Sequence, residues 1–588
     1  MPTLDWIGKK AVVNHHREVP YRLIHCDKTK SVGDPDAGNL LVQGDNLEAL
    51  KALLPYYAGK VKCIYIDPPY NTGNEGWVYN DNVNSPEIRA WLGATVGKEA
   101  EDLSRHDKWL CMMYPRLRLL KEFLTEDGVL LASIDDNESS HLSILLDEIF
   151  GGSNFVAKLI WEKGRKNDAK LFSTGHDYIY VYARRKTSLQ EVTWRAPKEG
   201  VTEIATEYHA LLEQTGEDWD AVSEGLRLFF SKLPKNHPSK KYQRAKNADA
   251  RGVWRDNNIS WHGGGGPKYD LIHPKTGKPC KVPDDGWRFV EDSMKRKIEE
   301  GYVVFREDHR KPPIYKSYIY VRDPQSVDQD EVDLEGQREV LSSVFYRHSQ
   351  PSNDLQKVMF GEKAFPNPKD HEVLARLVDY VTSGDKECIV LDSFSGSGST
   401  GHAVLALNAI DRGNRRVVLV EMDEQIATGI TAQRLKLAQE GYEYTAKNGQ
   451  LVTVGGLGGG FRFCTLGEPL FDADGNVSPA VTYPDLAAHV FFCETGSPIP
   501  RRADGSSTLI GTFQGRAIYL LHSAEAIGVA SANAGNVLTA SVLESLPSPE
   551  QDFTGARVVY AEGCTVPDDR LARFGVTFKQ VPYQIEGL

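Results

Sequence analysis

One short segment of the chain places a carboxylate, two prolines and an aromatic ring directly after an apolar run. Residues 63–66 (CIYI) predict a buried strand, and Asp67, Pro68, Pro69 and Tyr70 follow it at once. Open α/β sheets bind ligands at this end of their strands, and the prolines stiffen the backbone and leave carbonyls without local amide donors. A carboxylate and a carbonyl beside a ring suit a flat group with an exocyclic NH2. A proline-stiffened turn alone would not explain the neighbouring Asp and Tyr.

A second segment has the glycine pattern of a cofactor loop. The apolar run 389–391 ends at Asp392, and a loop with Gly396 and Gly398 leads from it into an apolar helix. Glycines let the backbone approach a ligand closely, and an acidic strand end can bind polar groups of a nucleoside. The next apolar run ends at Glu421, 29 residues after Asp392, where a carboxylate can accept both hydroxyls of a ribose. The loop is neither a Walker A loop nor a complete GxGxxG fingerprint.

Both segments lie in regions with the texture of parallel strands joined by helices. Over 40–183 and 370–440, apolar runs rich in Val and Ile alternate with runs of helical period, which predicts an α/β fold. Between them, 190–340 is polar and broken by Pro and Gly, so we expect short strands and no long helix there. Residues 454–461 (VGGLGGGF) predict a flexible joint before an α+β tail.

The composition is that of a globular protein with several domains. The chain has 588 residues, of which 40% are hydrophobic and 26% charged. This excludes disordered, collagen-like and coiled-coil proteins. We expect no membrane span and no export, because no long apolar stretch and no basic-then-apolar leader occurs. Eight single cysteines without a CxxC pair predict neither a zinc site nor a disulfide framework and indicate a reducing cytoplasm.

Charge is distributed unevenly along the chain. The formal net charge is −12 overall but +7 over 161–320, and 231–255 contains eight Lys or Arg and one Asp. From 461 onwards the net charge is −6, and Lys579 is the only lysine. A basic middle is compatible with phosphate binding, although a solvated loop would have the same charge. Our candidates for phosphate contact are Lys235, Lys240, Lys241, Arg244, Lys246 and Arg251.

These residues resemble one family. Asp67–Tyr70, followed about 325 residues later by Phe394-x-Gly396-x-Gly398, is similar to the permuted β class of DNA amino-methyltransferases, which use S-adenosylmethionine. Gly44-Asp45-Asn46 resembles the segment that contacts the adenosine of the cofactor. Phe365-Pro-Asn-Pro-Lys369 resembles the element that completes the cofactor pocket.

The resemblance implies a fold and a role for each of these residues. The fold would be a Rossmann-like S-adenosylmethionine-dependent methyltransferase fold with circularly permuted motif order, an inserted target-recognition domain and an α+β C-terminal domain. Asp67, Pro68, Pro69 and Tyr70 would be catalytic, and no metal is implied. The cofactor would be bound by Asp45, Asn46, Phe365, Lys369, Asp392, Phe394, Gly396, Gly398 and Glu421. The expected domains are an N-terminal extension (1–39), a catalytic half (40–189), the target-recognition domain (190–340), a cofactor-binding half (341–455) and an interaction domain (456–588).

The extended motif DPPYNTG and an insert of about 150 residues resemble the modification subunit of type III restriction systems. The implied function is site-specific adenine-N6 methylation of a flipped base in double-stranded DNA, as part of a restriction-modification or other phage-defence system. The implied location is the prokaryotic cytoplasm, in association with the nucleoid. Asp at the first motif position favours adenine over cytosine N4. Cytosine-N4 methylation, a non-catalytic DNA-recognition subunit and an RNA methyltransferase are the alternatives. Expected partners are DNA, a helicase-nuclease restriction subunit and a second copy of the chain, and no membrane.

Overall fold

The computed structural model describes most of the chain. The described residues are 3–34, 37–72, 90, 93–96, 105–164, 171–197, 200–234, 237–261, 263–322, 338–446, 448–472, 475–523 and 529–581. They divide into two compact units, one comprising Met1–Trp194 and Ser342–Leu588 and the other Arg195–Leu341. Within the described residues, no helix has the length and apolar character needed to cross a membrane.

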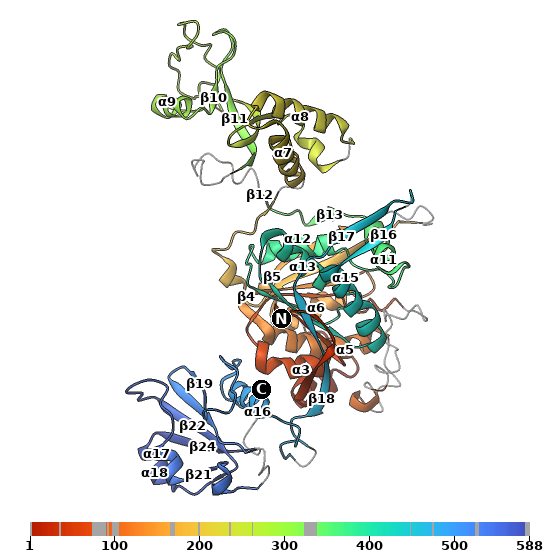
Figure 1. The fold of residues 1–588 in the computed structure, drawn as a ribbon, viewed down its shortest axis with the longest axis vertical. Coiled ribbons are helices and arrows are strands. Elements are labelled where there is room, and N and C mark those ends of the chain that lie inside the picture. Colours follow the sequence, from red (N-terminus) through yellow and green to blue (C-terminus); the bar gives the residue numbers. More distant parts are fainter. Residues whose placement is uncertain are drawn as a thin grey trace. The chain divides into compact units, whose positions relative to one another are not determined.

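A ten-stranded sheet forms the centre of the larger unit (Figure 1). Its strands, in spatial order, are β1 (Arg22–Gly33), β18 (Gly460–Pro469), β2 (Leu40–Gln43), β15 (Arg416–Glu421), β14 (Ile389–Asp392), β3 (Val61–Ile66), β4 (Leu124–Ile134), β6 (His176–Ala183), β5 (Phe155–Glu162) and β13 (Val344–Tyr346). The strands from β18 to β4 are parallel to one another, whereas β6 is antiparallel to β4 and β5. The expected α/β fold is confirmed. Because β3 and β14 are parallel neighbours, the two candidate segments that follow them lie at the same edge of the sheet.

Helices cover both faces of this sheet. On one face α3 (Asn46–Tyr57), α5 (Arg105–Phe123) and α6 (Ser139–Phe150) share a core with alternate strand residues such as Val42 and Ile64. The opposite face is covered by α12 (His371–Val381), α13 (Ser399–Asp411) and α15 (Ala432–Glu440), and Gly401 of α13 packs directly against Leu419 of β15. Successive strand residues point to opposite faces, so strands covered on both sides read as continuous apolar runs. The helices expected from the apolar period are confirmed.

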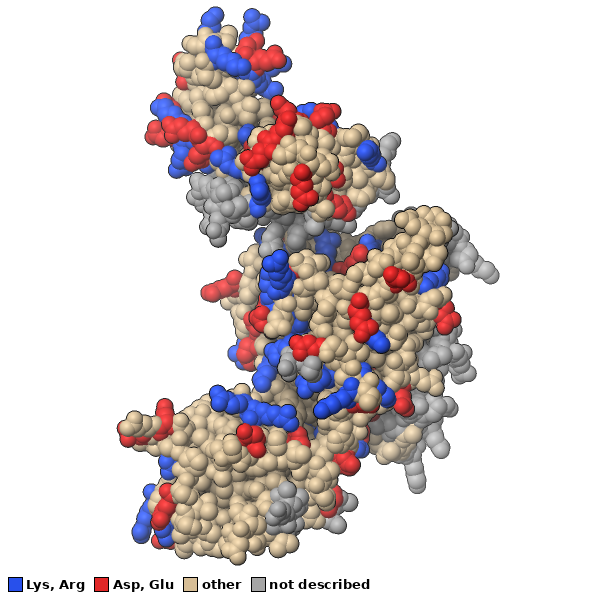
Figure 2. Space-filling view, in the orientation of Figure 1, with Lys and Arg blue, Asp and Glu red and all other residues tan. Residues whose placement is uncertain are grey.

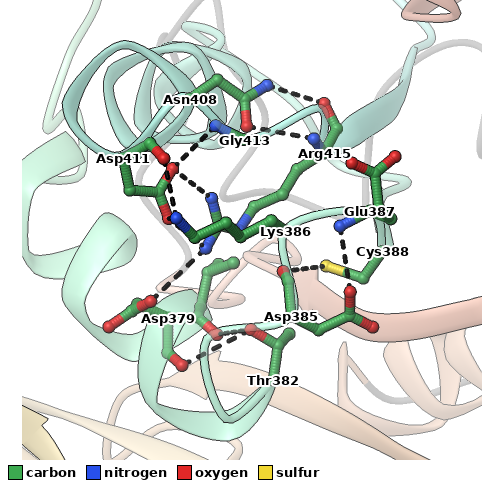
Figure 3. A network of polar contacts seen from close by, with 11 residues as sticks. Asp379, Thr382, Asp385, Lys386, Glu387, Cys388, Asn408, Asp411, Gly413 and Arg415 are labelled. Atoms are coloured by element: carbon green, nitrogen blue, oxygen red, sulfur yellow. Dashed lines mark hydrogen bonds and ion pairs between the residues drawn. The ribbon is translucent and has the colours of Figure 1, made fainter. Parts of the chain in front are cut away.

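A buried arginine fixes the start of β15 against α12 and α13 (Figure 3). The guanidinium of Arg415 is fully buried and donates to both carboxylate oxygens of Asp411, at 3.0 and 2.9 Å. It also lies 3.5 Å from Asp379 of α12. The backbone of Arg415 exchanges two hydrogen bonds with the amide of Asn408, at 2.8 and 3.0 Å. A bidentate charged pair of this kind fixes geometry, and it holds the helix pair from the end of the sheet opposite to the candidate segments.

Two expectations about the region after residue 440 are wrong. The glycine-rich segment is not a flexible joint, because Leu457 N and Gly458 N donate to the last carbonyls of α15, at 2.9 and 3.1 Å. The segment leads from the hairpin β16 (Gly441–Thr445) and β17 (Leu451–Gly455) directly into β18 of the central sheet. Cys26 of β1 and Cys464 of β18 are register partners and form a disulfide. The expectation of no disulfide framework is therefore wrong for this pair, which is 438 residues apart.

The C-terminal part combines a helix in the main core with a small sheet. Leu486, Val490 and Phe491 of α16 (Tyr483–Thr495) belong to the same hydrophobic cluster as α3 and α5. The sheet has the order β19 (Leu509–Phe513), β20 (Arg516–Leu520), β22 (Ala556–Ala561) and β24 (Val576–Gln580), with α17 (Ala540–Glu544) and α18 (Asp568–Arg573) in the connections. Strands β20, β22 and β24 are parallel. The N-terminal helices α1 (Lys9–Val12) and α2 (His15–Glu18) contact α5.

The smaller unit contains two helices that the sequence reasoning missed. These are α7 (Val201–Thr215) and α8 (Trp219–Lys232), and they pack on a sheet of order β10 (Val303–Val304), β11 (Ile314–Val321), β9 (Gly252–Asn258) and β8 (Asn247–Asp249), near α9 (Glu291–Glu299). The expectation of no long helix in 190–340 is wrong. Val222, Leu226 and Phe230 recur at helical spacing and are buried, and Asp218 caps α8 by accepting from Ala221 N. This local signal was present but is surrounded by charged residues.

Candidate active site

A cavity of about 1260 Å³ opens beyond the carboxyl ends of β3 and β4. It lies entirely within the larger unit. Three of its lining residues, Asp67, Pro68 and Tyr70, belong to the first candidate segment. Thr72 follows this segment, and the rest of the lining comes from the ends of β4 and β5, the start of β6, and the segment 348–370 that includes Phe365 and Lys369.

Asp67 is paired with a lysine from the distant half of the sequence. Lys369 Nζ lies 2.6 Å from Asp67 Oδ2 and 4.7 Å from the centre of the Tyr70 ring. The other carboxylate oxygen, Asp67 Oδ1, is buried and has no hydrogen-bond partner among the described residues. A buried acceptor of this kind favours a ligand that brings an N–H or O–H group. Lys369, which the resemblance assigns to the cofactor pocket, lies against the carboxylate of the first candidate segment.

A second carboxylate, Asp177 at the start of β6, completes this charged cluster. It accepts a hydrogen bond from the Tyr70 hydroxyl at 2.8 Å, forms an ion pair with Lys163, and lies 3.6 Å from Lys369 Nζ. Although burial favours its neutral form, the Lys163 and Lys369 ammonium groups lower the pKa of Asp177. Burial and this carboxylate raise the pKa of Tyr70. The sequence reasoning missed Asp177 and Lys163, and the only signal was an acidic residue at the start of an apolar strand.

The backbone of the first candidate segment is held from both sides. Trp109 of α5 donates its indole N–H to the Pro69 carbonyl at 2.7 Å. Asn71 has a left-handed φ of 58° and is fully buried, and its side-chain amide donates to Glu138. These contacts keep Asp67 and Tyr70 in one orientation relative to the cavity.

Two histidines complete the surroundings of Glu138. His106 Nδ1 and His141 Nδ1 lie 2.7 and 2.8 Å from the two oxygens of this fully buried carboxylate. The three side chains bring atoms that could bind a metal within 4.8 Å of one another. The structure joins these same atoms by hydrogen bonds. Together with the amide of Asn71, the group supports the turn after Tyr70.

The glycine loop after β14 is organised by two buried carboxylates. Asp392 accepts from Phe394 N at 3.0 Å and from the Thr400 hydroxyl at 2.5 Å. Glu421 accepts from Gly396 N at 2.8 Å and from Asp423 N at 3.0 Å. Burial raises the pKa of both carboxyl groups to about 7. They therefore hold the loop shape as well as offering oxygen atoms to a ligand.

The loop fits a ligand that approaches the backbone closely. Gly396 and Gly398 have φ values of 48° and 75°, which side-chain-bearing residues rarely adopt. A Cβ at Gly398 would lie 3.1 Å from Thr431. The hydroxyls of Ser393 and Ser395 are buried without a hydrogen-bond partner among the described residues. Orphaned donors beside two carboxylates suit the hydroxyl and amino groups of a nucleoside.

The segment before the first candidate strand joins this loop. Asn46 donates through Nδ2 to the Ser393 carbonyl at 3.3 Å. Asp45 caps α3 by accepting from Leu47 N at 2.8 Å, and it pairs with Arg116 at 3.0 Å. The Ser399 hydroxyl also donates to the Lys369 carbonyl at 2.7 Å. The structure thus brings the two halves of the expected site together, and it adds Arg116, which the sequence reasoning missed.

The candidate phosphate-binding residues of the smaller unit differ in their surroundings. Lys241, Arg244 and Lys246 are exposed. Lys240 donates to the Phe230 carbonyl, and Arg251 donates to the Glu300 carbonyl at 2.6 Å, so both have structural partners. Lys235 lies outside the described residues.

Comparison with known proteins identifies the family. The sequence model of the DNA methylase family (N6_N4_Mtase) matches residues 61–433, and the chain belongs to this family.

Two of its relatives are subunits of type III restriction-modification enzymes. The EcoP15I Mod subunit of Escherichia coli is 34% identical over 441 residues, which are 72% of this chain and 64% of the relative. The EcoPI Mod subunit of Escherichia phage P1 is 32% identical over 448 residues, with the same two coverages. The chain therefore spans less than two thirds of the length of these relatives.

More distant similarities extend to type II enzymes and solved structures. The type II methyltransferase M.KpnI of Klebsiella pneumoniae is 25% identical over 415 residues, which are 68% of this chain and 85% of the relative. The PvuII DNA methyltransferase (cytosine-N4-specific) structure is 10% identical, covers 69% of this chain and 89% of its own, and has a TM-score of 0.31.

Proposed function

We propose that the chain is a site-specific DNA adenine-N6 methyltransferase that acts as the modification subunit of a type III-like restriction-modification or phage-defence system. One observation carries the proposal. The Asp67 segment and the glycine loop follow neighbouring parallel strands, β3 and β14, so an amine acceptor and a nucleoside-type pocket share one edge of the sheet. Membership of the DNA methylase family and the similarity to Mod subunits support this function.

The residues around Asp67 suit the activation of an exocyclic amine. The lone pair of such an amine is delocalised into its ring, which makes it a poor nucleophile. Hydrogen bonds from the amine to the Asp67 carboxylate and the Pro68 carbonyl would favour a tetrahedral nitrogen. Tyr70, oriented by Asp177, would stack on a base that has been flipped out of the duplex. Flipping the base costs a few kcal/mol.

The cofactor pocket would consist of the residues assigned from the sequence, with a further role for Lys369. Glu421, Asp392, Phe394, Gly396 and Gly398 would hold the nucleoside part of S-adenosylmethionine, with Asp45, Asn46 and Phe365 beside it. When bound, this cofactor would supply an electrophilic methyl group on a sulfonium. Lys369 would have a second role besides binding the cofactor, which is to position Asp67. Placing the amine and the methyl donor in line would lower the barrier by several kcal/mol.

The catalytic proposal is tested by methyl transfer with Asp67→Asn. We expect a loss of at least about 100-fold in the transfer of labelled methyl to DNA, while cofactor and DNA affinities stay within about threefold of wild type. The variant keeps the size of the side chain but removes the negative charge of the carboxylate that would accept hydrogen bonds from the amine. Activity near that of the wild type would refute the assignment of Asp67.

The base and the site are tested by single-molecule sequencing of DNA from cells that express the protein. We expect N6-methyladenine at one short motif. Finding N4-methylcytosine instead would show that the target base is cytosine, which is the alternative. A wild-type protein that binds S-adenosylmethionine and DNA but transfers no methyl would favour the non-catalytic recognition subunit.

We also propose a division of labour between the remaining parts of the chain. Residues 190–340 would recognise the target, since this is the basic region and it forms a compact unit within 195–341. The tail after 456 would bind protein partners, namely a helicase-nuclease subunit or a second copy of the chain. Figure 2 supports this, because charged side chains are sparse on the visible face of the C-terminal part. Exchange of 190–340 with the same segment of a relative should change the methylated motif, and an active chimaera that keeps the original motif would contradict it.

A further inference from the structure

Two large apolar side chains stand almost completely exposed beside the candidate active site. Leu171 is 92% exposed and Phe172 is 90% exposed. Among the exposed large hydrophobic residues of the described part, these two have the highest values, and no other two are sequence neighbours. Neither side chain contributes hydrophobic burial to this fold. Because the two side chains are adjacent, they form a small contiguous apolar patch, and exposed apolar patches are a feature of surfaces that meet a partner.

The pair is close to the mouth of the cavity. Thr174 and Gly175 line the cavity, as do His176 and Asp177. Since each residue spans at most about 3.6 Å, the Cα atom of Phe172 lies within roughly 7 Å of that of Thr174. Asp177, five residues further on, holds the Tyr70 hydroxyl. The exposed pair is therefore connected by a short segment to the residues that surround Asp67.

The charge of the neighbouring sequence favours a polyanion as the partner. Lys163 is paired with Asp177, but residues 164–170 (GRKNDAK) contain three further Lys or Arg and one Asp. An apolar pair that follows a basic stretch matches duplex DNA, which has an anionic backbone and apolar base faces. Proteins that open or kink a duplex insert Phe and Leu side chains between base steps.

We propose that Leu171 and Phe172 enter the duplex at the target base and fill the space that this base leaves when it flips into the cavity. This inference rests on the proposed function, because only an enzyme that acts on a duplex base needs such a step. The two side chains act as positioning residues. They stabilise the flipped state by restoring stacking for the neighbouring base pairs, and they take no part in methyl transfer.

The test compares two DNA substrates that differ only in whether a base pair must be broken. One is a fully paired duplex, and the other carries an abasic site opposite the target base. On the paired duplex we expect the double variant Leu171→Ala/Phe172→Ala to lose about 10- to 100-fold in methyl transfer, since unstacking takes a few kcal/mol. On the abasic duplex it should stay within about threefold of wild type. 2-Aminopurine at the target position should show a smaller fluorescence increase with the variant on the paired duplex.

Two further variants serve as controls. Ile410→Ala removes another apolar side chain, 80% exposed at the end of α13, and should leave both substrates unaffected. Phe172→Leu keeps an apolar side chain at this position and should retain most of the wild-type activity on the paired duplex. Equal losses on both substrates, or no loss on either, would overturn the inference. A wild-type protein that methylates neither substrate would overturn the proposed function and this inference with it.

Discussion

Lys369 Nζ lies 2.6 Å from Asp67 Oδ2, although the two residues are 302 positions apart in the chain. The same lysine is 3.6 Å from Asp177, and its backbone carbonyl accepts a hydrogen bond from Ser399 at the start of α13. Lys369 therefore links the carboxylate that would receive the amine to the helix that follows the cofactor loop.

Replacement of Lys369 should impair chemistry more than binding. In Lys369→Met, Asp67 and Asp177 lose the cation that they share, and a buried charge without its partner is strongly unfavourable. We expect kcat to fall by about 10- to 100-fold. The pKa of Asp177 should rise, so the acidic limb of the pH–rate profile should move to higher pH. Lys369→Arg keeps the charge and serves as the control. An unchanged pH profile in Lys369→Met would show that Lys369 does not control the pKa of Asp177.

A side chain at Gly398 should weaken cofactor binding selectively. A side chain is strained at a φ of 75°, and a Cβ would lie 3.1 Å from Thr431, which would have to shift. Gly398→Ala should therefore distort the loop that Glu421 supports. We expect affinity for S-adenosylmethionine to fall by about tenfold or more in calorimetry, with DNA affinity preserved. Gly515→Ala is a matched control, because Gly515 has a φ of 74° and open space around it. Equal effects of the two variants on cofactor affinity would place the cofactor elsewhere.

Glu421 should make stability depend on pH in a defined window. Its pKa is raised from 4.5 to about 7, so between these values the folded protein holds a proton that the unfolded chain has released. The stabilisation is fully present below pH 4.5 and is lost as the pH rises through 7. We expect the free energy of unfolding of Glu421→Gln to fall less steeply with pH than that of wild type, by up to about 1.4 kcal/mol per pH unit.

The measurement for Glu421 is chemical denaturation at a series of pH values between about 5 and 8. Glu424→Gln is the control, since Glu424 is an exposed residue three positions further along the chain. It should keep the slope of the wild type. Parallel curves for Glu421→Gln and wild type would mean that the carboxyl group does not titrate in this range.

Neutralising the exposed cations of the smaller unit should weaken binding to all DNA sequences alike. Replacing Lys241, Arg244 and Lys246 with Gln should flatten the dependence of log affinity on log salt by up to about three units. The methylated motif should not change, because phosphate contacts carry no sequence information. A triple Gln variant of the exposed Lys275, Lys278 and Lys281 in the same unit controls for net charge. An equal effect of both triples would contradict a local phosphate site.

Local pattern was sufficient for the elements that carry the site. The apolar runs before Asp67 and Asp392, the glycines at 396 and 398, and the helical period of 108–124 depend on neighbouring residues only. The structure has strands, a loop and a helix there, and the helix ends at Phe123. The helices α7 and α8 also had a local signal, since Ile204 and Tyr208, like Val222 and Leu226, repeat at four residues. Their many charged neighbours made the region read as loop.

The contacts between distant segments were decided only by the tertiary structure. No spacing in the sequence indicates that Lys369 would reach Asp67, that Asp177 would hold Tyr70, or that β18 would lie between β1 and β2 with Cys464 against Cys26. These contacts depend on the order and direction of strands within one sheet, which side-chain periodicity does not encode. The sequence by itself therefore determined which groups could do chemistry, because residue type and local backbone suffice for that. The arrangement of those groups around the cavity was determined by the sheet, because it joins residues that are hundreds of positions apart.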